Sequence, residues 1–193
     1  MGSIVVARPP GHAHGWDDDL VVVDGGATRS QSVANALAAV ETELVAIHDA
    51  ARPLVTPELI DGVTATLLAD PEAGGAIAAA PVTDTIKRAM ADGGGSASRS
   101  QDSGGYSDQK AAIPVIGKTI DRAGLWAAQT PQVFRVETLR RALQADPGRV
   151  EAATDEAMLV ERAGGRVLLH PSPAENLKVT TPRDLRLAEL LLA

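Results

Sequence analysis

A carboxylate and a guanidinium follow a short apolar run, in positions where they could bind a metal ion and a phosphate. The segment His48–Pro53 places the carboxylate of Asp49 shortly before the guanidinium of Arg52. Asp49 could hold Mg²⁺, which prefers one or two carboxylates together with phosphate oxygens, and Arg52 could grip a phosphate with two hydrogen bonds. A local salt bridge between the two is the alternative. His48 could be a general base, but a single histidine at a strand end favours a structural role.

A glycine-rich turn is the second candidate for chemistry. The segment Asp24–Ser32 leaves a predicted strand and enters a predicted helix. Such a turn offers bare backbone amides and the positive end of a helix to an anion or a polar base. An ordinary strand-to-helix connection is the alternative, because glycine-rich patterns have modest specificity.

Lys178 is the third candidate. It stands among apolar neighbours in Asn176–Thr180, where an unpaired ammonium would be costly unless it faced a polar pocket. The alternative is a surface lysine whose ammonium reaches water. His12 and His14 have no carboxylate or cysteine beside them, so we expect no metal site there.

The elements that must position these residues alternate between strands and helices. Short β-branched runs predict strands, and two pairs of a threonine followed by proline, Thr56–Pro57 and Thr181–Pro182, mark helix starts. Strands are expected at residues 3–7, 20–23, 44–48, 75–80, 166–170 and 176–179, and helices at 30–40, 56–68, 136–144, from 154 to about 163, and from 182 onward. This alternation predicts an α/β fold with a doubly wound, mostly parallel sheet, whose carboxyl edge gathers the candidate residues.

The middle of the chain differs in composition. Residues 92–110 are rich in Gly, Ser, Asp and Gln, and predict a mobile loop, because they cannot bury enough apolar surface to offset the entropy of ordering. The flanking residues 81–88 and 113–122 are β-like. We therefore expect a β-arm over residues 81–122 with that loop at its tip, within one domain of residues 1–193.

Composition narrows the function. The formal net charge of −7 and 2% aromatic residues disfavour a nucleic-acid partner. The sequence has no cysteine, which excludes thiol chemistry, and no apolar run of about 18 residues, so no membrane span is expected. A cytoplasmic location is compatible with these features.

Six blocks, in their order along the chain, resemble those of the 2-C-methyl-D-erythritol 4-phosphate cytidylyltransferase family of isoprenoid precursor synthesis. They are Asp24–Gly26 with Arg29 and Ser32, His48–Pro53, Ala80–Lys87, Asp121–Gln132, Thr154–Ala157 and Asn176–Thr180. The resemblance implies a Rossmann-like nucleotidyltransferase whose protruding β-arm embraces a second subunit in a homodimer. It also implies CTP and a sugar-alcohol phosphate as substrates and Mg²⁺ as cofactor.

The resemblance also implies roles for single residues. Lys178, Arg122 and Asp49 would be catalytic, with Asp49 also at the metal. The nucleotide would be bound by Gly26, Ser32, Asp49 and Ala50, and the acceptor phosphate substrate by Arg52, Thr85, Arg122, Thr130 and Thr154.

Two departures from the family pattern bear on activity. The family begins with a strand and a glycine-rich loop whose Arg and Lys cradle the CTP triphosphate, and we find no such segment here, so a central strand of the sheet is expected to be missing. The chain alone is therefore expected to be weak or inactive. The arm tip is also longer than the resemblance leads us to expect.

Two other functions remain open. A pentitol-phosphate cytidylyltransferase shares the nucleotide chemistry and differs in the acceptor pocket. A non-catalytic remnant that binds cytidine nucleotides or dimerises would follow from loss of the phosphate loop.

Overall fold

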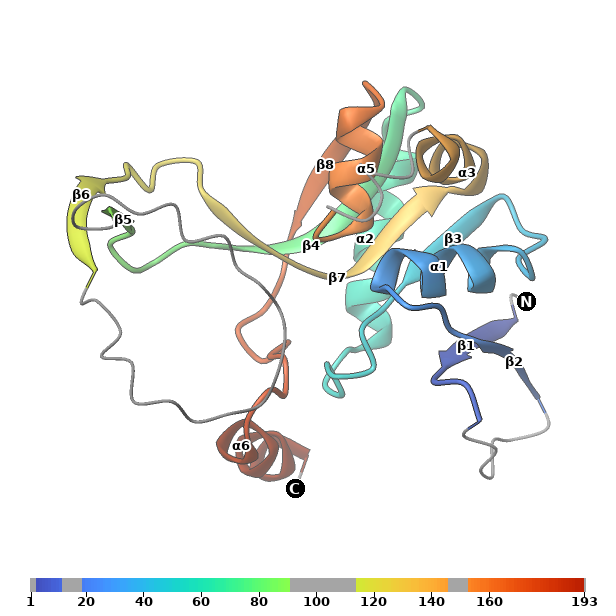
Figure 1. Ribbon diagram of the computed structural model, residues 1–193, viewed down its shortest axis with the longest axis horizontal. Coiled ribbons are helices and arrows are strands. Elements are labelled where there is room, and N and C mark those ends of the chain that lie inside the picture. Colours follow the sequence, from blue (N-terminus) through green and yellow to red (C-terminus); the bar gives the residue numbers. More distant parts are fainter. Residues whose placement is uncertain (1–2, 12–18, 91–113, 146–152, 193) are drawn as a thin grey trace. The chain divides into compact units, whose positions relative to one another are not determined.

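The structure, a computed structural model, describes residues 3–11, 19–90, 114–145 and 153–192. His12, His14 and the predicted loop at residues 92–110 lie outside this part. The chain divides into one unit made of Met1–Ala80 with Ala127–Ala193 and a second unit, Pro81–Trp126, which holds the predicted arm (Figure 1). None of the helices in the described part of the chain has both the length and the apolar character needed to cross a bilayer.

The first unit holds eleven of the described elements and the second unit two, counted by the unit in which most of each element lies. In chain order the first unit contains β1 (Ile4–Arg8), β2 (Leu20–Asp24), α1 (Arg29–Leu37), β3 (Leu44–Ile47), α2 (Pro57–Leu68), β4 (Ala73–Pro81), β7 (Trp126–Arg135), α3 (Val136–Gln144), α5 (Glu156–Arg162), β8 (Arg166–Pro171) and α6 (Pro182–Leu192). The second unit contains β5 (Lys87–Met90) and β6 (Val115–Thr119).

The strands of the first unit form two sheets. Four strands lie in the order β3-β7-β4-β8, with β3 antiparallel to β7 and β4 parallel to β8. β1 and β2 form a separate parallel pair. The α/β class predicted from the sequence is confirmed, and the larger sheet is mixed because β7 runs against β3.

Helices cover both faces of the four-stranded sheet, as a doubly wound fold requires. On one face Ile77 of β4 and Phe134 of β7 pack in a core with α1, α3 and α5. On the other face Ala76 and Ala78 of β4 and Val133 of β7 pack against α2. Successive residues of a strand point to opposite faces, so the apolar run of β4 serves both cores.

Local signals place the helix starts that bring the site together. Thr28 and Thr56 cap α1 and α2, each accepting a hydrogen bond from the backbone three residues on, and Pro57 is the first residue of α2. Asp155 caps α5 in the same way, through Met158. Each cap side chain satisfies a backbone donor that the helix leaves unpaired.

Two segments differ from the sequence prediction. The strand predicted at residues 176–179 is wrong, because this segment belongs to no sheet and is held instead by the amide of Val179, which donates to the carbonyl of Ala51 at 2.7 Å. β7 was not predicted, because its sequence lacks the alternation of apolar and polar residues typical of a strand and contains Pro131.

The second unit is a two-stranded ribbon. β5 pairs antiparallel with β6, with Lys87 opposite Thr119, and both strands lie within residues 81–122, although β5 extends two residues beyond the flank 81–88. The amide of Ile120 on the carbonyl of Ile86 at 2.9 Å extends the pairing. Every residue of both strands is exposed.

Candidate active site

The carboxylate of Asp49 lies between two cations at the end of β3. Lys178 Nζ donates to Asp49 Oδ2 at 2.9 Å, and Arg29 Nη2 lies 3.4 Å from Asp49 Oδ1. The side chain of Lys178 is 47% exposed, so its ammonium can still reach a ligand. Three segments that are far apart in the sequence therefore meet at one carboxylate.

The second partner of Arg29 extends this array. Arg29 Nη1 donates to both carboxylate oxygens of Glu156, at 2.6 and 2.5 Å, and the Glu156 side chain is fully buried. The order Glu156, Arg29, Asp49, Lys178 alternates negative and positive charge. Neither Arg29 nor Glu156 was assigned a role from the sequence.

The pKa values reflect this arrangement. Burial alone would raise the pKa of Asp49, but the hydrogen bond from Lys178 and the charges of Arg29 and Lys178 lower it on balance. Burial alone would lower the pKa of Arg29, but Glu156 and then Asp49 raise it on balance. Asp49 is therefore an anion, and Arg29 a cation, throughout the neutral range.

The backbone of Asp49 is also held by a side chain of β7. Its amide donates to Thr130 Oγ1 at 3.0 Å, and the same hydroxyl lies 3.1 Å from His48 Nδ1. His48 Nε2 lies 3.0 Å from the carbonyl oxygen of Arg52, so both ring nitrogens have protein partners. This geometry agrees with a structural role for His48, and it leaves Thr130 buried beside Asp49.

Arg52 makes a different contact from the salt bridge considered above. Its Nη1 donates to the carbonyl oxygen of Asn176 at 2.7 Å, while the partners of Asp49 are Arg29 and Lys178. Burial lowers the pKa of Arg52, and the charge of Asp49 opposes this. The guanidinium links the segment after β3 to the segment that carries Lys178.

A buried amide fixes that second segment. Asn176 Nδ2 donates to Gln129 Oε1 at 2.8 Å, to the carbonyl of Thr130 at 3.0 Å and to Ser172 Oγ at 3.1 Å. Because Asn176 is two residues before Lys178, the network restrains the backbone from which the Lys178 side chain reaches Asp49.

The glycine-rich turn is arranged differently from the sequence prediction. The amide of Gly26 donates to Ser32 Oγ at 3.0 Å, and the amide of Ala27 donates to Gln31 Oε1 at 3.0 Å. The amide of Gly25 donates to the carbonyl of Arg8 at 2.7 Å. The prediction of bare amides is wrong for these three, because side chains of α1 and the neighbouring strand already accept from them.

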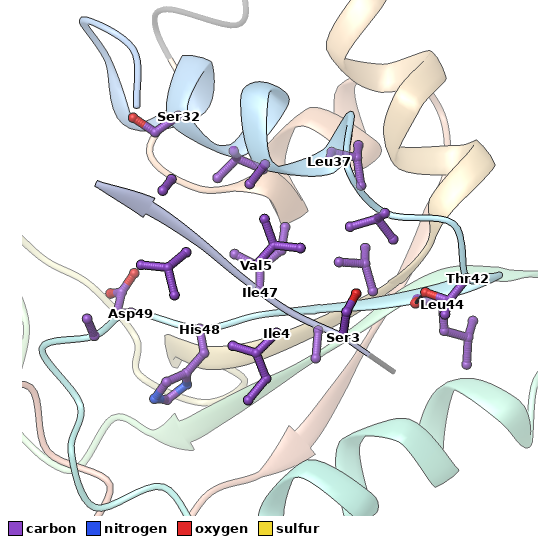
Figure 2. Close-up of a pocket in the computed structure, with 18 of the residues that line it drawn as sticks. Ser3, Ile4, Val5, Ser32, Leu37, Thr42, Leu44, Ile47, His48 and Asp49 are labelled. Atoms are coloured by element: carbon purple, nitrogen blue, oxygen red, sulfur yellow. Dashed lines mark hydrogen bonds between the residues drawn. The ribbon is translucent and has the colours of Figure 1, made fainter. Parts of the chain in front are cut away.

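A cavity of about 890 Å³ lies between β1, α1 and β3. Figure 2 shows Ser32 and Asp49 toward one end of it and Thr42 and Leu44 at the other. Its polar end is lined by Arg29, Ser32, His48, Asp49 and Ala50, and the remainder is mostly aliphatic. Within the described residues β1 pairs only with β2 and β3 only with β7, so the cavity separates the two sheets.

Asp49 is the one carboxylate among the described residues that line this cavity. The described residues contain no group of three or more His, Cys, Asp or Glu side chains that could hold a metal on their own. This donor set fits Mg²⁺, which is held by one or two carboxylates while the substrate phosphates complete its coordination.

Other predicted residues lie elsewhere. Thr154 is exposed in the segment just before α5. Thr85 and Arg122 belong to the second unit, where Arg122 Nη1 donates to the carbonyl of Thr83. The signal that could have found Arg29 and Glu156 is their place in two of the matched blocks, where each is the first residue of a helix.

Comparisons with known proteins agree on one family. Residues 5–193 match the family model described as 2-C-methyl-D-erythritol 4-phosphate cytidylyltransferase. A bifunctional enzyme IspD/IspF of Anaeromyxobacter dehalogenans is 39% identical over all of this chain and 46% of its own length. A 2-C-methyl-D-erythritol 4-phosphate cytidylyltransferase of Acidobacterium capsulatum is 40% identical over 93% of this chain and 67% of its own. The chain thus spans about half to two thirds of these relatives.

The crystal structure of the 2-C-methyl-D-erythritol 4-phosphate cytidylyltransferase from Thermus thermophilus matches with a TM-score of 0.76 and 33% identity, over 98% of this chain and 82% of that one. The Francisella tularensis structure matches with a TM-score of 0.77 and 28% identity, over 98% and 80%. The fold is therefore shared along nearly the whole chain.

Proposed function

The chain belongs to the 2-C-methyl-D-erythritol 4-phosphate cytidylyltransferase family, and on this basis we propose that it transfers a cytidylyl group from CTP to 2-C-methyl-D-erythritol 4-phosphate. Pyrophosphate is the second product. The reaction would serve isoprenoid precursor synthesis by the non-mevalonate route.

The observation that carries the proposal is the placement of Lys178 and Arg29 on either side of Asp49. Such a pair of cations suits a reaction that brings two phosphate groups together. Both cations pair with Asp49 and both side chains are partly exposed, 39% for Arg29 and 47% for Lys178, so each can also reach a phosphate bound beside that carboxylate.

The reaction needs no general base from the protein. An oxygen of the acceptor phosphate, already anionic at neutral pH, attacks the α-phosphorus of CTP. The bond from that phosphorus to the bridging oxygen breaks, and pyrophosphate leaves with the electron pair. Catalysis then consists of alignment and of cations that stabilise negative charge in the transition state. This agrees with a His48 ring whose two nitrogens are occupied.

We place the nucleotide at the polar end of the cavity, with Ser32, Asp49 and Ala50 on its walls. Gly26 would act through the turn that its amide forms with Ser32. Mg²⁺ bound at Asp49 would supply charge neutralisation on the CTP phosphates. Lys178 and Arg29 would keep Asp49 ionised and oriented for that role.

The acceptor phosphate is assigned to Arg52, Thr130 and Thr154 of the first unit and to Thr85 and Arg122 of the arm. Thr130 would serve it by fixing Asp49 rather than by direct contact, because its hydroxyl already accepts from the Asp49 amide. The arm residues would act from a second copy of the chain.

We propose a homodimer formed through the arm. Met90 and Ile116 are 59% and 62% exposed on β5 and β6, and Val115 is also exposed. A two-stranded ribbon is marginally stable alone, so such apolar side chains favour contact with another surface. The cytoplasmic location expected from the sequence stays a prediction, which cell fractionation would test.

Release of pyrophosphate tests the function. The purified chain is incubated with CTP, Mg²⁺ and 2-C-methyl-D-erythritol 4-phosphate, with a pentitol phosphate as the competing acceptor. We expect release that needs an acceptor and is faster with methylerythritol phosphate. Pyrophosphate release that does not depend on an acceptor, or no release with either acceptor, would contradict the proposed function.

A further inference from the structure

Glu156 is a buried carboxylate that no step of the proposed transfer uses. It is the first residue of α5, its side chain is 0% exposed, and it is not among the residues that line the cavity. A buried carboxylate is costly unless it is paired and hydrogen-bonded. Its partner is Arg29, which donates to both of its oxygens.

Glu156 thereby holds one terminal nitrogen of the Arg29 guanidinium, and the other terminal nitrogen is directed toward Asp49. Nη1 is engaged by Glu156, while Nη2 lies 3.4 Å from Asp49 Oδ1. Because a guanidinium is planar, fixing one terminal nitrogen restricts the direction of the second. Arg29 lines the polar end of the cavity, whereas Glu156 contacts Arg29 without lining the cavity.

The start of α5 is anchored to the same frame as Asp49. Gln132 Nε2 donates to Asp155 Oδ2 at 3.1 Å, and Asp155 caps the helix. Gln132 of β7 lies opposite Ile47, two residues before Asp49. The position of Glu156 relative to Asp49 is therefore set by the sheet.

We infer that Glu156 is a positioning residue, whose buried carboxylate holds the Arg29 guanidinium beside Asp49 so that it faces the phosphates of the bound nucleotide. This rests on the proposed function, since CTP is the ligand that Arg29 would meet. Glu156 itself touches neither substrate.

The direction in which Glu156→Gln changes the affinity for CTP separates positioning from a simple charge effect. Removing a negative charge near an anion site strengthens anion binding through the electrostatic field alone. Removing the group that holds Arg29 leaves its guanidinium free to rotate away from Asp49 and from the bound phosphates. Weaker CTP binding by Glu156→Gln therefore indicates lost positioning.

The test is calorimetric titration with CTP and Mg²⁺, and with cytidine as a ligand that has no phosphate. The proteins are the wild-type chain, Glu156→Gln, and Glu161→Gln, which removes a charge from an exposed position of α5. We expect Glu156→Gln to weaken CTP binding about tenfold, the scale of a hydrogen bond to a charged group, without changing the affinity for cytidine. Glu161→Gln should bind both ligands as the wild type does.

A double-mutant cycle with Arg29→Met completes the test. Glu156→Gln should have no further effect on CTP affinity in the Arg29→Met background, with Glu156→Asp as the second variant if the Gln variant does not fold. Equal or tighter CTP binding by Glu156→Gln, or the same loss without Arg29, would overturn the role of Glu156 alone. A wild-type chain that binds no CTP would overturn the proposed function and this inference together.

Discussion

Lys178 Nζ lies 2.9 Å from Asp49 Oδ2, although 129 residues separate the two in the sequence. The contact joins the end of β3 to the segment that follows β8. It fixes the orientation of the proposed metal-binding carboxylate. It also places the ammonium of Lys178 beside that carboxylate, within reach of a phosphate bound there.

This contact predicts a titration effect. Because Lys178 lowers the pKa of Asp49, Lys178→Ala should raise that pKa above its wild-type value, while Arg29 keeps part of the depression. Carbon-13 NMR of the side-chain carboxyl, followed across acid pH, measures the change. An unchanged Asp49 titration would show that the ion pair does not form in solution.

Asn176 should affect both stability and activity. Asn176→Ala removes a buried donor to Gln129, Thr130 and Ser172, and should cost about 1–3 kcal/mol of unfolding free energy. It should also lower transfer activity in the surviving folded protein, because Lys178 lies two residues on. Asn35→Ala, which removes an exposed amide from α1, is the matched control in urea unfolding and activity assays.

The control should stay close to wild type in both measurements. An Asn176→Ala variant that is equally stable would contradict the buried network. A variant that loses stability without losing activity would show that the network does not orient Lys178.

Asp184 should stabilise the start of α6 in a pH-dependent way. Its carboxylate accepts from the amides of Thr180 and Thr181 and from the Thr180 hydroxyl, and these bonds lower its pKa to about 2. A depressed folded-state pKa contributes stability above the unfolded-state pKa, near 3.8, that is lost as the pH falls toward 2.

Amide hydrogen exchange in α6 measures this effect in Asp184→Asn. Protection should be lower than in wild type at pH 5 and above, and the difference should shrink toward pH 2. Glu189→Gln, at an exposed position of the same helix, should show no such trend. A constant difference across this range would exclude the carboxylate as its source.

Ile116→Asp should weaken the proposed dimer. Ile116 is 62% exposed on β6, so a carboxylate is tolerated in the monomer but costly in a buried interface. Light scattering after size-exclusion chromatography should find a lower dimer fraction than in wild type. Lys118→Glu on the same strand is the control for charge alone, and identical behaviour of all three proteins would argue against the arm as interface.

Local signals made part of the fold predictable. The pair Thr56 and Pro57 marks a helix start through a cap and a fixed backbone angle, and α2 begins there. β7 was missed because it contains Pro131 and lacks an alternating pattern, and residues 176–179 were wrongly assigned because apolar neighbours can also flank a segment outside a sheet.

The site was predictable as a set of residues and less so as a geometry. Asp49 and Lys178 were both singled out, and the structure brings them together. The pairing of Arg29 with Glu156 spans 127 residues, and an acidic residue in a first helical turn already has a local explanation in the helix dipole. Nothing in either local sequence distinguishes a buried ion pair from two exposed charges.

Phosphorus-31 NMR of the reaction mixture tests the central claim most directly, because it identifies the bond that forms. The chain and its Lys178→Ala variant are incubated at high concentration with CTP, Mg²⁺ and 2-C-methyl-D-erythritol 4-phosphate. The account predicts a new diphosphate linkage between cytidine monophosphate and the acceptor, with pyrophosphate formed in equal amount and the signal lost in Lys178→Ala. The same linkage formed equally well without Lys178, or cytidine monophosphate released without an acceptor adduct, would contradict it.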